Sequence, residues 1–339
     1  MDITDLESKY NTKDTKQRPE ETVFTSVCQC GPLHLWRLSQ TKELVLNHYL
    51  IKSPIPIYVF FLVISNYFFF FHYIYPFGNW KFEFLRYLYL FIMIYSLIVY
   101  LIIFYEGPGY LPYYYPRRPK GKDDLSGFVT TEDQYYYVKS KHFPRHIQYF
   151  SSAGRLVIRA DHFCAWTGSF IGKRNLKVFM QFVILILVYL GTMLPFETKI
   201  GVMIIKKTIS FSYVDLAVYL FYYCQSCFLT FLTLKILVST IAVNTVGMSS
   251  FEYYYQYIHR ISLSTRLPAI DNWELVCGPR SQWYLWLLPI PAFWHLDDYE
   301  LAEMVIRDNK RANDFRESMG ELPFMYDGDS SLPFFKMSA

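Results

Sequence analysis

The chain has 339 residues, of which 53% are hydrophobic, 20% are aromatic and only 18% are charged. This balance excludes an ordinary soluble domain, in which about a quarter of the residues are charged, and favours a membrane protein. The formal net charge of +4 at pH 7 is too small to indicate nucleic-acid binding, and no basic stripe alternates with stacking aromatic residues. We therefore expect the lipid bilayer, and no nucleic acid, among the partners.

The N-terminal part of the chain, residues 1–52, is expected to lie in the cytosol. Its polar and acidic start has no features of a cleavable signal peptide, so the first apolar segment must carry the targeting information. The first residues have the composition of a disordered tail. From Pro32 to Leu50, apolar residues alternate with Arg37, Lys42 and Glu43, and this stretch predicts a helix in the membrane interface.

The six cysteines form no closely spaced even set, so reduced thiols are expected and a disulfide scaffold is not. Cys28 and Cys30 are interpreted as ordinary cytosolic thiols, with a juxtamembrane lipidation site as the alternative. Cys224 and Cys227 flank Gln225 and Ser226 within an apolar run. This polar patch is predicted to serve helix packing, with a transport pathway as the alternative.

Four apolar runs predict four membrane-spanning helices. They cover roughly residues 55–75, 87–105, 178–196 and 216–242. About 20 residues are needed to cross a hydrocarbon core of about 30 Å, and these runs are close to that length or exceed it. We expect no ionisable residue in the middle of a span, because Lys235 lies close enough to the cytosolic end for its amine to reach water.

Lysine and arginine residues predict the orientation of the spans. The segments outside the spans hold 7, 2, 11, 3 and 8 of them in chain order, and the remaining two of the 33 are Lys177 and Lys235. This alternation places both termini and the central loop in the cytosol. The predicted fold is an α-helical polytopic membrane protein with a small cytosolic domain between helices 2 and 3. Its parts are a cytosolic tail at 1–52, transmembrane helices 1 and 2 at 53–106, the cytosolic domain at 107–176, transmembrane helices 3 and 4 at 177–243, and a cytosolic C-terminal region at 244–339.

The central loop holds an acid, an imidazole and a thiol within four residues, namely Asp161, His162 and Cys164. These groups are the minimum set for an activated sulfur nucleophile. In an extended segment or a tight turn, His162 and Cys164 lie on one side, so the imidazole can take the thiol proton while Asp161 orients the ring. On local spacing alone, a chance or structural arrangement is the alternative.

Further motifs surround this triad in a definite order. They are Gly107-Pro108-Gly109, Asp161-His162-Phe163-Cys164, then Trp166, Gly172, Arg174, Asn175 and Phe179, then Ser249-Ser250-Phe251-Glu252, and Asn272-Trp273-Glu274-Leu275-Val276-Cys277-Gly278. Over roughly residues 50–290 they resemble the DHHC protein S-acyltransferases (palmitoyltransferases) in order and spacing. The corresponding family motifs are Asp-Pro-Gly, Asp-His-His-Cys, Thr-Thr-x-Glu and a C-terminal motif that contains Asn. Gly107, Phe163 and the two serines are departures from that pattern.

The resemblance implies an enzyme that moves a long acyl chain from acyl-CoA, through a thioester at Cys164, to cysteines of membrane-associated protein substrates. It implies His162 as the base and Asp161 as the group that orients it. Palmitoyl-CoA or a similar acyl-CoA would be the co-substrate, with no permanently bound cofactor. Arg159, Lys173 and Arg174 flank the nucleophile and are predicted to contact the phosphates of CoA. We expect a multi-pass protein of an endomembrane such as the ER or Golgi.

The family that the chain resembles binds structural zinc through Cys and His residues, which are missing here. An alignment without gaps puts side chains that cannot ligate zinc at those positions: Tyr136, Lys139, Tyr149, Leu156, Phe150, Ala153, Phe163 and Phe170. Most are aromatic or apolar, so we predict a zinc-free domain in which they form a hydrophobic cluster, each buried ring or Leu contributing roughly 1.5–3 kcal/mol. The missing ligands also motivate an alternative function, a catalytically inactive membrane adaptor. An unrelated channel or transporter is a third.

The region beyond about residue 290 is less informative. Several acidic residues precede several basic ones, namely Asp297, Asp298, Glu300 and Glu303 before Arg307, Lys310 and Arg311. This charge order supports a helix, and the abundance of charges predicts that the helix is solvated.

Overall fold

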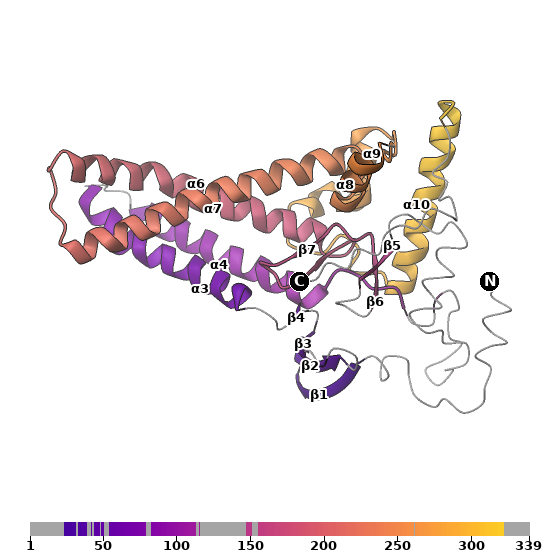
Figure 1. The fold of residues 1–339 in the computed structure, drawn as a ribbon, viewed down its shortest axis with the longest axis horizontal. Coiled ribbons are helices and arrows are strands. Elements are labelled where there is room, and N and C mark those ends of the chain that lie inside the picture. Colours follow the sequence, from indigo (N-terminus) through magenta and orange to yellow (C-terminus); the bar gives the residue numbers. More distant parts are fainter. Residues whose placement is uncertain are drawn as a thin grey trace. The chain divides into compact units, whose positions relative to one another are not determined.

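A computed structural model describes residues 24–31, 33–38, 42, 44–47, 49–50, 54–78, 83–112, 115, 147–150, 155–260 and 262–321 (Figure 1). The described residues fall into two compact units. The helical unit comprises residues 54–103 and 178–242. The motif unit comprises the described residues within 1–53, 104–177 and 243–339, and therefore holds the motifs that surround Cys164.

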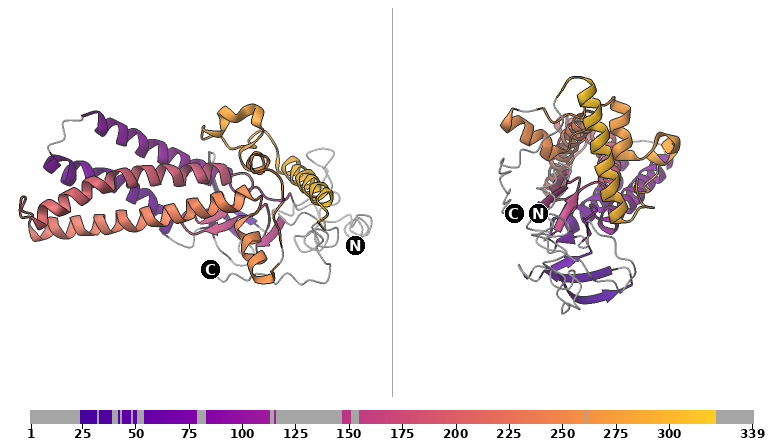
Figure 2. Two further views of the ribbon diagram at one scale, coloured as in Figure 1. Left: turned by 90° about the horizontal axis from the view of Figure 1, so that it is seen from above. Right: turned by 90° about the vertical axis from the view of Figure 1, so that its right-hand side faces the viewer.

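Four long helices form the helical unit, and each is long and apolar enough to cross a membrane. They are α3 (Ile55–Phe69, continued by a π-helical turn to Ile74), α4 (Glu83–Glu106), α6 (Leu176–Ile205) and α7 (Tyr213–Thr245). In Figures 1 and 2 they run lengthwise beside one another. The four predicted spans are confirmed as helices, and the chain is an α-helical polytopic membrane protein.

Tyrosine hydroxyls connect neighbouring helices of this unit. The pairs are Tyr89 with the Thr192 hydroxyl at 2.9 Å, Tyr189 with the Val63 carbonyl at 3.1 Å, and Tyr219 with the Glu197 carbonyl at 2.9 Å. Water is scarce in a hydrocarbon layer, so a polar group there is satisfied by another part of the protein. These bonds therefore specify which faces of the helices meet, in addition to the packing of their apolar side chains.

Glu197 is an ionisable residue inside a span, which we did not expect. The third apolar run ends near residue 196, but helix α6 continues to Ile205, so that Glu197 lies within it and is fully buried. The Ser226 hydroxyl of α7 donates a hydrogen bond to its carboxyl at 3.3 Å. A buried polar group needs such a partner, so this contact supports a packing role for the polar patch around Ser226.

The predicted interfacial helix near residues 32–50 is wrong, because this part of the chain forms a small antiparallel sheet. Strands β1 (Phe24–Cys30), β2 (Leu33–Leu38), β3 (Leu44–Leu46) and β4 (Tyr49–Leu50) pair in sequence order. At the start of β2, Leu33, His34 and Leu35 alternate with the period of two that is typical of a strand, but Trp36 interrupts the alternation. Gly31, with φ of +57°, allows the tight turn between β1 and β2. The predicted disordered tail before residue 24 lies outside the described residues.

Two further hairpins, three short helical elements and one helix of 21 residues, α10, make up the rest of the described motif unit. The hairpins pair β5 (Ile147–Phe150) with β6 (Arg155–Ile158), and β7 (His162–Cys164) with β8 (Ser169–Ile171). After α7 come α8 (Ser250–His259), α9 (Ala269–Cys277), the 3-10 helix η3 (Arg280–Trp286) and α10 (Asp298–Ser318).

Leu156 stands where the family that the chain resembles has a zinc ligand. Its side chain is buried in a hydrophobic cluster. We call this cluster the tail cluster, because it joins the central region to α10 and the residues before it. Its buried members are Leu111, Tyr115, Leu156, Ile158, Phe293, Leu301, Ala302 and Val305. The predicted helix at α10 is confirmed, but it is not solvated on all sides, since Leu301, Ala302 and Val305 pack here.

Phe163 and Phe170 occupy two more of these positions and pack against each other. Their ring centroids are 5.1 Å apart, with the ring planes at 71°. They belong to a second cluster, the hairpin cluster, with Tyr110, Val157, Ala160 and Phe251. The described apolar residues at zinc-ligand positions are thus packed, in two clusters where we predicted one. Tyr136, Lys139 and Ala153, and the side chains of Tyr149 and Phe150, lie outside the described part.

Truncation of Leu156 tests whether apolar packing supports the central region. Leu156→Ala removes a fully buried side chain and should lower the free energy of unfolding by about 2–5 kcal/mol. The matched variant Leu33→Ala, at a position 51% exposed, should change it by less than about 0.5 kcal/mol. Denaturant unfolding in detergent measures both values. Equal effects of the two substitutions would contradict a core role for Leu156.

Candidate catalytic site

The short hairpin β7–β8 presents the predicted nucleophile. Cys164 pairs with Ser169 and His162 with Ile171, and Gly168, with φ of +59°, lets the chain return within the intervening turn. Because side chains alternate along a strand, His162 and Cys164 lie on one face and Phe163 on the other. The predicted extended geometry at this motif is confirmed.

Contacts join the acid, the imidazole and the thiol in series. Asp161 Oδ2 lies 2.8 Å from His162 Nδ1, and the His162 ring is also within hydrogen-bonding distance of the Cys164 thiol. The contact with Asp161 leaves Nε2 as the ring nitrogen available to the thiol. The three residues thus have the mutual arrangement of a nucleophile, a base and an orienting carboxylate.

The pKa values of the thiol and the imidazole are shifted toward an ion pair. Burial alone would lower the pKa of His162, but hydrogen bonds to Asp161 and Cys164, together with their charges, raise it to about 10. Burial alone would raise the pKa of Cys164, but the hydrogen bond and charge of His162 bring it below its ordinary value, with help from Thr167. Both shifts favour a thiolate beside an imidazolium over the neutral pair.

Asp161 is buried at the N-terminus of helix α8. Its carboxylate accepts hydrogen bonds from the Ser250 backbone N–H at 2.9 Å and the Ser250 hydroxyl at 2.8 Å. Ser249 and Glu252 form a capping box that starts this helix just before Ser250. Burial alone would raise the pKa of Asp161, but His162 and Ser250 bring it below its ordinary value. The Ser-Ser-Phe-Glu motif therefore stabilises the negative charge of Asp161.

Thr167 is a site residue that sequence reasoning missed. In the turn after β7, its backbone N–H and its hydroxyl each lie 3.2 Å from the Cys164 carbonyl oxygen. The same two groups lower the pKa of the Cys164 thiol. The available signal was a hydroxyl residue three positions after the cysteine, where a tight turn brings the two together.

The Gly-Pro-Gly motif contacts the last residue of β6 and Gly172, the residue that follows β8. The Ile158 N–H donates to the Gly109 carbonyl at 3.0 Å. A Cβ at Gly172 would lie only 2.6 Å from the Pro108 carbonyl oxygen, so this close approach requires glycine. The Asn175 side chain accepts the Gly172 N–H at 2.8 Å. Motifs that are far apart in the chain thus meet at the base of β8.

The three cations predicted to contact CoA bind groups of the C-terminal region. Their partners are the Leu275 carbonyl (3.3 Å) and Asn244 (3.1 Å) for Arg159, the Leu275 carbonyl (2.5 Å) and Asp308 (3.5 Å) for Lys173, and the Leu296 carbonyl (2.9 Å) and Asp298 (2.8 Å) for Arg174. Arg159 and Lys173 are 3% and 2% exposed. These bonds attach the C-terminal region to the hairpin, and a contact of the three residues with CoA stays a prediction.

Asn272 holds the C-terminal motif in place. Its side chain donates to the Thr245 carbonyl at 2.9 Å and accepts from the Thr265 hydroxyl at 2.7 Å. Thr245 is the last residue of α7, so the bond ties α9 to the end of that helix. A Cβ at Gly247 would clash with both Thr265 and Asn272. The conformation of this corner therefore depends on glycine at 247 and on the Asn272 amide.

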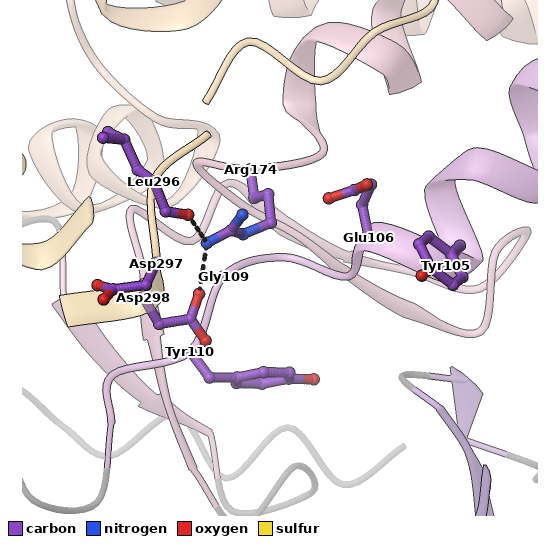
Figure 3. Close-up of a pocket in the computed structure, with 8 residues that line it drawn as sticks. All are labelled: Tyr105, Glu106, Gly109, Tyr110, Arg174, Leu296, Asp297 and Asp298. Atoms are coloured by element: carbon purple, nitrogen blue, oxygen red, sulfur yellow. Dashed lines mark hydrogen bonds and ion pairs between the residues drawn. The ribbon is translucent and has the colours of Figure 1, made fainter. Parts of the chain in front are cut away.

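A pocket of about 390 Å³ lies beside Arg174 (Figure 3). Its lining residues are Tyr105, Glu106, Gly109, Tyr110, Arg174, Leu296, Asp297 and Asp298. The guanidinium of Arg174 points at the Leu296 carbonyl and the Asp298 carboxylate. Three acidic side chains surround this single cation, so the electrostatics of the pocket disfavour a phosphate group. Cys164 is not part of its lining.

The described residues at the zinc-ligand positions do not fit structural zinc. Leu156, Phe163 and Phe170 have no donor atom for the metal, and each packs in an apolar cluster. Among the residues that the structure describes, no group of three or more His, Cys, Asp or Glu side chains is arranged to hold a metal ion.

Comparison with known proteins agrees with the motifs. Residues 129–257, from before β5 to within α8, match the family model of the DHHC palmitoyltransferases. A stretch of 110 residues, 31% of this chain, is 30% identical to the probable protein S-acyltransferase 12 of Arabidopsis thaliana. The match spans about 37% of the length of that relative. The region matched by the family model includes Asp161, His162 and Cys164.

The ion pair at Cys164 predicts an unusual titration of its thiol. In the wild type the thiolate should persist as the pH falls below about 8.5, the ordinary pKa of a thiol, because the imidazolium stabilises it. His162→Gln should shift the midpoint of the thiol titration to higher pH. Without the imidazolium, the hydrogen bond and charge that offset the effect of burial on the Cys164 pKa are missing. The ultraviolet absorbance of the thiolate, taken as the difference from Cys164→Ser, measures this midpoint. An ordinary wild-type midpoint that His162→Gln does not move would contradict the ion pair.

Proposed function

We propose that this chain, which resembles the DHHC palmitoyltransferases and is an integral membrane protein, is a protein S-acyltransferase. It would move a long acyl chain from palmitoyl-CoA or a similar acyl-CoA to cysteines of membrane-associated proteins. The observation that carries this proposal is the series of contacts from Asp161 through His162 to Cys164. Acyl transfer needs a thiolate, and this arrangement favours its formation by lowering the pKa of Cys164.

In the first step of the proposed reaction, the Cys164 thiolate attacks the carbonyl carbon of the acyl-CoA thioester. A bond forms between the Cys164 sulfur and that carbon, and the bond to the CoA sulfur breaks. The leaving CoA thiolate takes the proton of the His162 imidazolium and departs as a thiol. The acyl chain is then held by Cys164 as a thioester, and His162 is neutral with Asp161 still on its Nδ1.

In the second step, neutral His162 takes the proton of a cysteine thiol of the protein substrate. The resulting thiolate attacks the carbonyl carbon of the Cys164 thioester, and Cys164 leaves as a thiolate. The thiolate–imidazolium pair is thereby restored. Asp161 stabilises the imidazolium in both steps, and Thr167 stabilises the thiolate whenever it is free.

The proposed topology follows from the distribution of positive charges. Both termini and the domain at 107–176 would face the cytosol, where acyl-CoA is available, with the spans at 53–106 and 177–243 in an endomembrane such as the ER or Golgi. The tails at 1–52 and 244–339 would be cytosolic. The nucleophile would thus act at the membrane surface, where it can meet a water-soluble head group and an apolar tail together.

A catalytically inactive adaptor is a second candidate function, and one observation favours it. Cys164 is only 5% exposed, so a substrate must reach a sulfur that its surroundings largely cover. An adaptor would keep the membrane helices and the packed motif unit without using the thiol. The two functions differ in whether Cys164 becomes acylated, which can be measured directly.

Acyl labelling distinguishes the enzyme from the adaptor. Purified wild-type protein incubated with an alkyne-tagged palmitoyl-CoA should acquire a label that hydroxylamine removes, and Cys164→Ser should stay blank. His162→Gln should label more slowly by about 10²–10⁴-fold, the usual contribution of a general acid or base. In-gel fluorescence after click coupling measures the rates. Equal labelling of wild type and Cys164→Ser would place the acyl group on other thiols and refute the proposed role of Cys164.

Metal analysis tests the zinc-free core. We expect purified protein to contain far less than one zinc per chain, and a strong chelator to leave its melting temperature unchanged, because apolar packing replaces the metal. Elemental analysis and thermal unfolding with and without chelator give the two readouts. Stoichiometric zinc, or a large drop in melting temperature, would show that other residues bind the metal.

A further inference from the structure

An apolar segment between α9 and α10 is not accounted for by the site. From Trp283 to Trp294 the chain contains no charged residue, and Trp283, Trp286 and Trp294 are spread along it. The segment is well below the length of about 20 residues that a membrane-spanning helix needs. It begins in the 3-10 helix η3, and prolines follow at 289 and 291. We call it the tryptophan segment.

The inner side of the tryptophan segment is firmly attached to the motif unit. The Trp286 indole N–H donates to the Gly278 carbonyl at 3.1 Å. Phe293 is buried in the tail cluster, and the Lys173 ammonium lies 4.6 Å from the centre of its ring. Lys173 also binds the carbonyl of Leu275, which belongs to the Asn-containing motif. The segment is therefore held in a defined position.

The outer side exposes large apolar and aromatic side chains. Trp283, Tyr284 and Leu287 are 64%, 55% and 75% exposed, and Trp294 is also exposed. Leaving such area in water is unfavourable by about 25 cal/mol per Å² relative to burial. Several large exposed apolar side chains within five consecutive residues are typical of a surface that meets a membrane or another protein.

Lys177 connects this segment to the beginning of a membrane span. The residue is the second in helix α6 and is 2% exposed. Its ammonium donates to the carbonyls of Leu285 and Ile290, the latter at 2.8 Å. Since α6 is one of the four helices long and apolar enough to span a membrane, these bonds attach the segment to the first turn of such a helix.

We propose that Trp283, Tyr284 and Leu287 insert into the interfacial layer of the lipid bilayer and anchor the motif unit to the membrane surface. Trp and Tyr favour this layer because their rings are apolar and their N–H or O–H groups still reach water. A short, uncharged, aromatic segment beside the start of a span has the chemistry of a lipid-facing surface. The anchor goes beyond the proposed function and does not require it.

Photo-cross-linking in full-length protein tests the anchor. The photoreactive residue p-benzoylphenylalanine replaces Leu287, and the protein is reconstituted into phosphatidylcholine vesicles that contain an alkyne-tagged phosphatidylcholine. Phe231, 69% exposed in span α7, is the positive control position. Met319, 66% exposed and apolar but placed after α10, is the matched control within the motif unit. After irradiation, click coupling reports the lipid adduct at each position.

We expect a lipid adduct at position 287 that approaches the yield at 231 and exceeds the yield at 319 several-fold. A yield at 287 no higher than at 319 would overturn the anchor. A cross-link between two copies of the chain at 287, without lipid adduct, would also overturn it and assign the patch to a protein interface. The readout is lipid contact and not acyl transfer, so its failure is distinguishable from failure of the proposed reaction.

A second variant separates the anchor from general hydrophobicity. Lys177→Met removes the bonds to Leu285 and Ile290, and should lower the adduct yield at 287 several-fold while the yield at 231 is unchanged. An unchanged yield at 287 in folded Lys177→Met protein would contradict the proposed role of Lys177 in positioning the segment. The yield at 231 shows whether the variant is still inserted.

Discussion

The buried carboxylate of Asp161 is the group on which the site depends. Taken out of water, it is stable only because His162 and both donors of Ser250 surround it. The same contacts orient the imidazole toward Cys164 and join the hairpin β7–β8 to helix α8. One ionic group thereby couples the chemistry of the thiol to the start of the C-terminal region, which is why the Asp-His-x-Cys and Ser-Ser-Phe-Glu motifs act together.

Around this group, apolar side chains pack at positions where the family that the chain resembles has metal ligands. Leu156 joins the tail cluster and Phe163 with Phe170 joins the hairpin cluster. Each cluster contains a residue that follows the Gly-Pro-Gly motif: Tyr110 in the hairpin cluster and Leu111 in the tail cluster. A zinc ion can hold a small loop by itself, whereas apolar side chains stabilise only when other elements cover them. This requirement explains why α10 and Phe293 are part of the core.

Buried cations complete the attachment of the C-terminal region. Arg159 and Lys173 both donate to the Leu275 carbonyl, and Lys177 donates to carbonyls of the tryptophan segment. A buried ammonium or guanidinium needs several acceptors, and backbone carbonyls at the ends of short helices supply them. The positive charges counted as signs of cytosolic orientation therefore also have structural partners. A short path leads from the hairpin of Cys164, through Lys173 and Leu275, toward the segment proposed to contact lipid.

The sequence by itself determined the four long helices and the extended geometry of the Asp-His-x-Cys motif, because both depend on local properties: the length of apolar runs, and the alternation of neighbouring side chains. It did not determine the sheet at residues 24–50, where alternation was taken for an interfacial helix. Nor did it determine the partners of Arg159 and Lys173, the burial of Glu197, the contact of Thr167 with Cys164, or the packing of α10. Those features were decided by tertiary structure, since each requires residues that are distant in the chain, or a turn whose closure is not written in any single residue type.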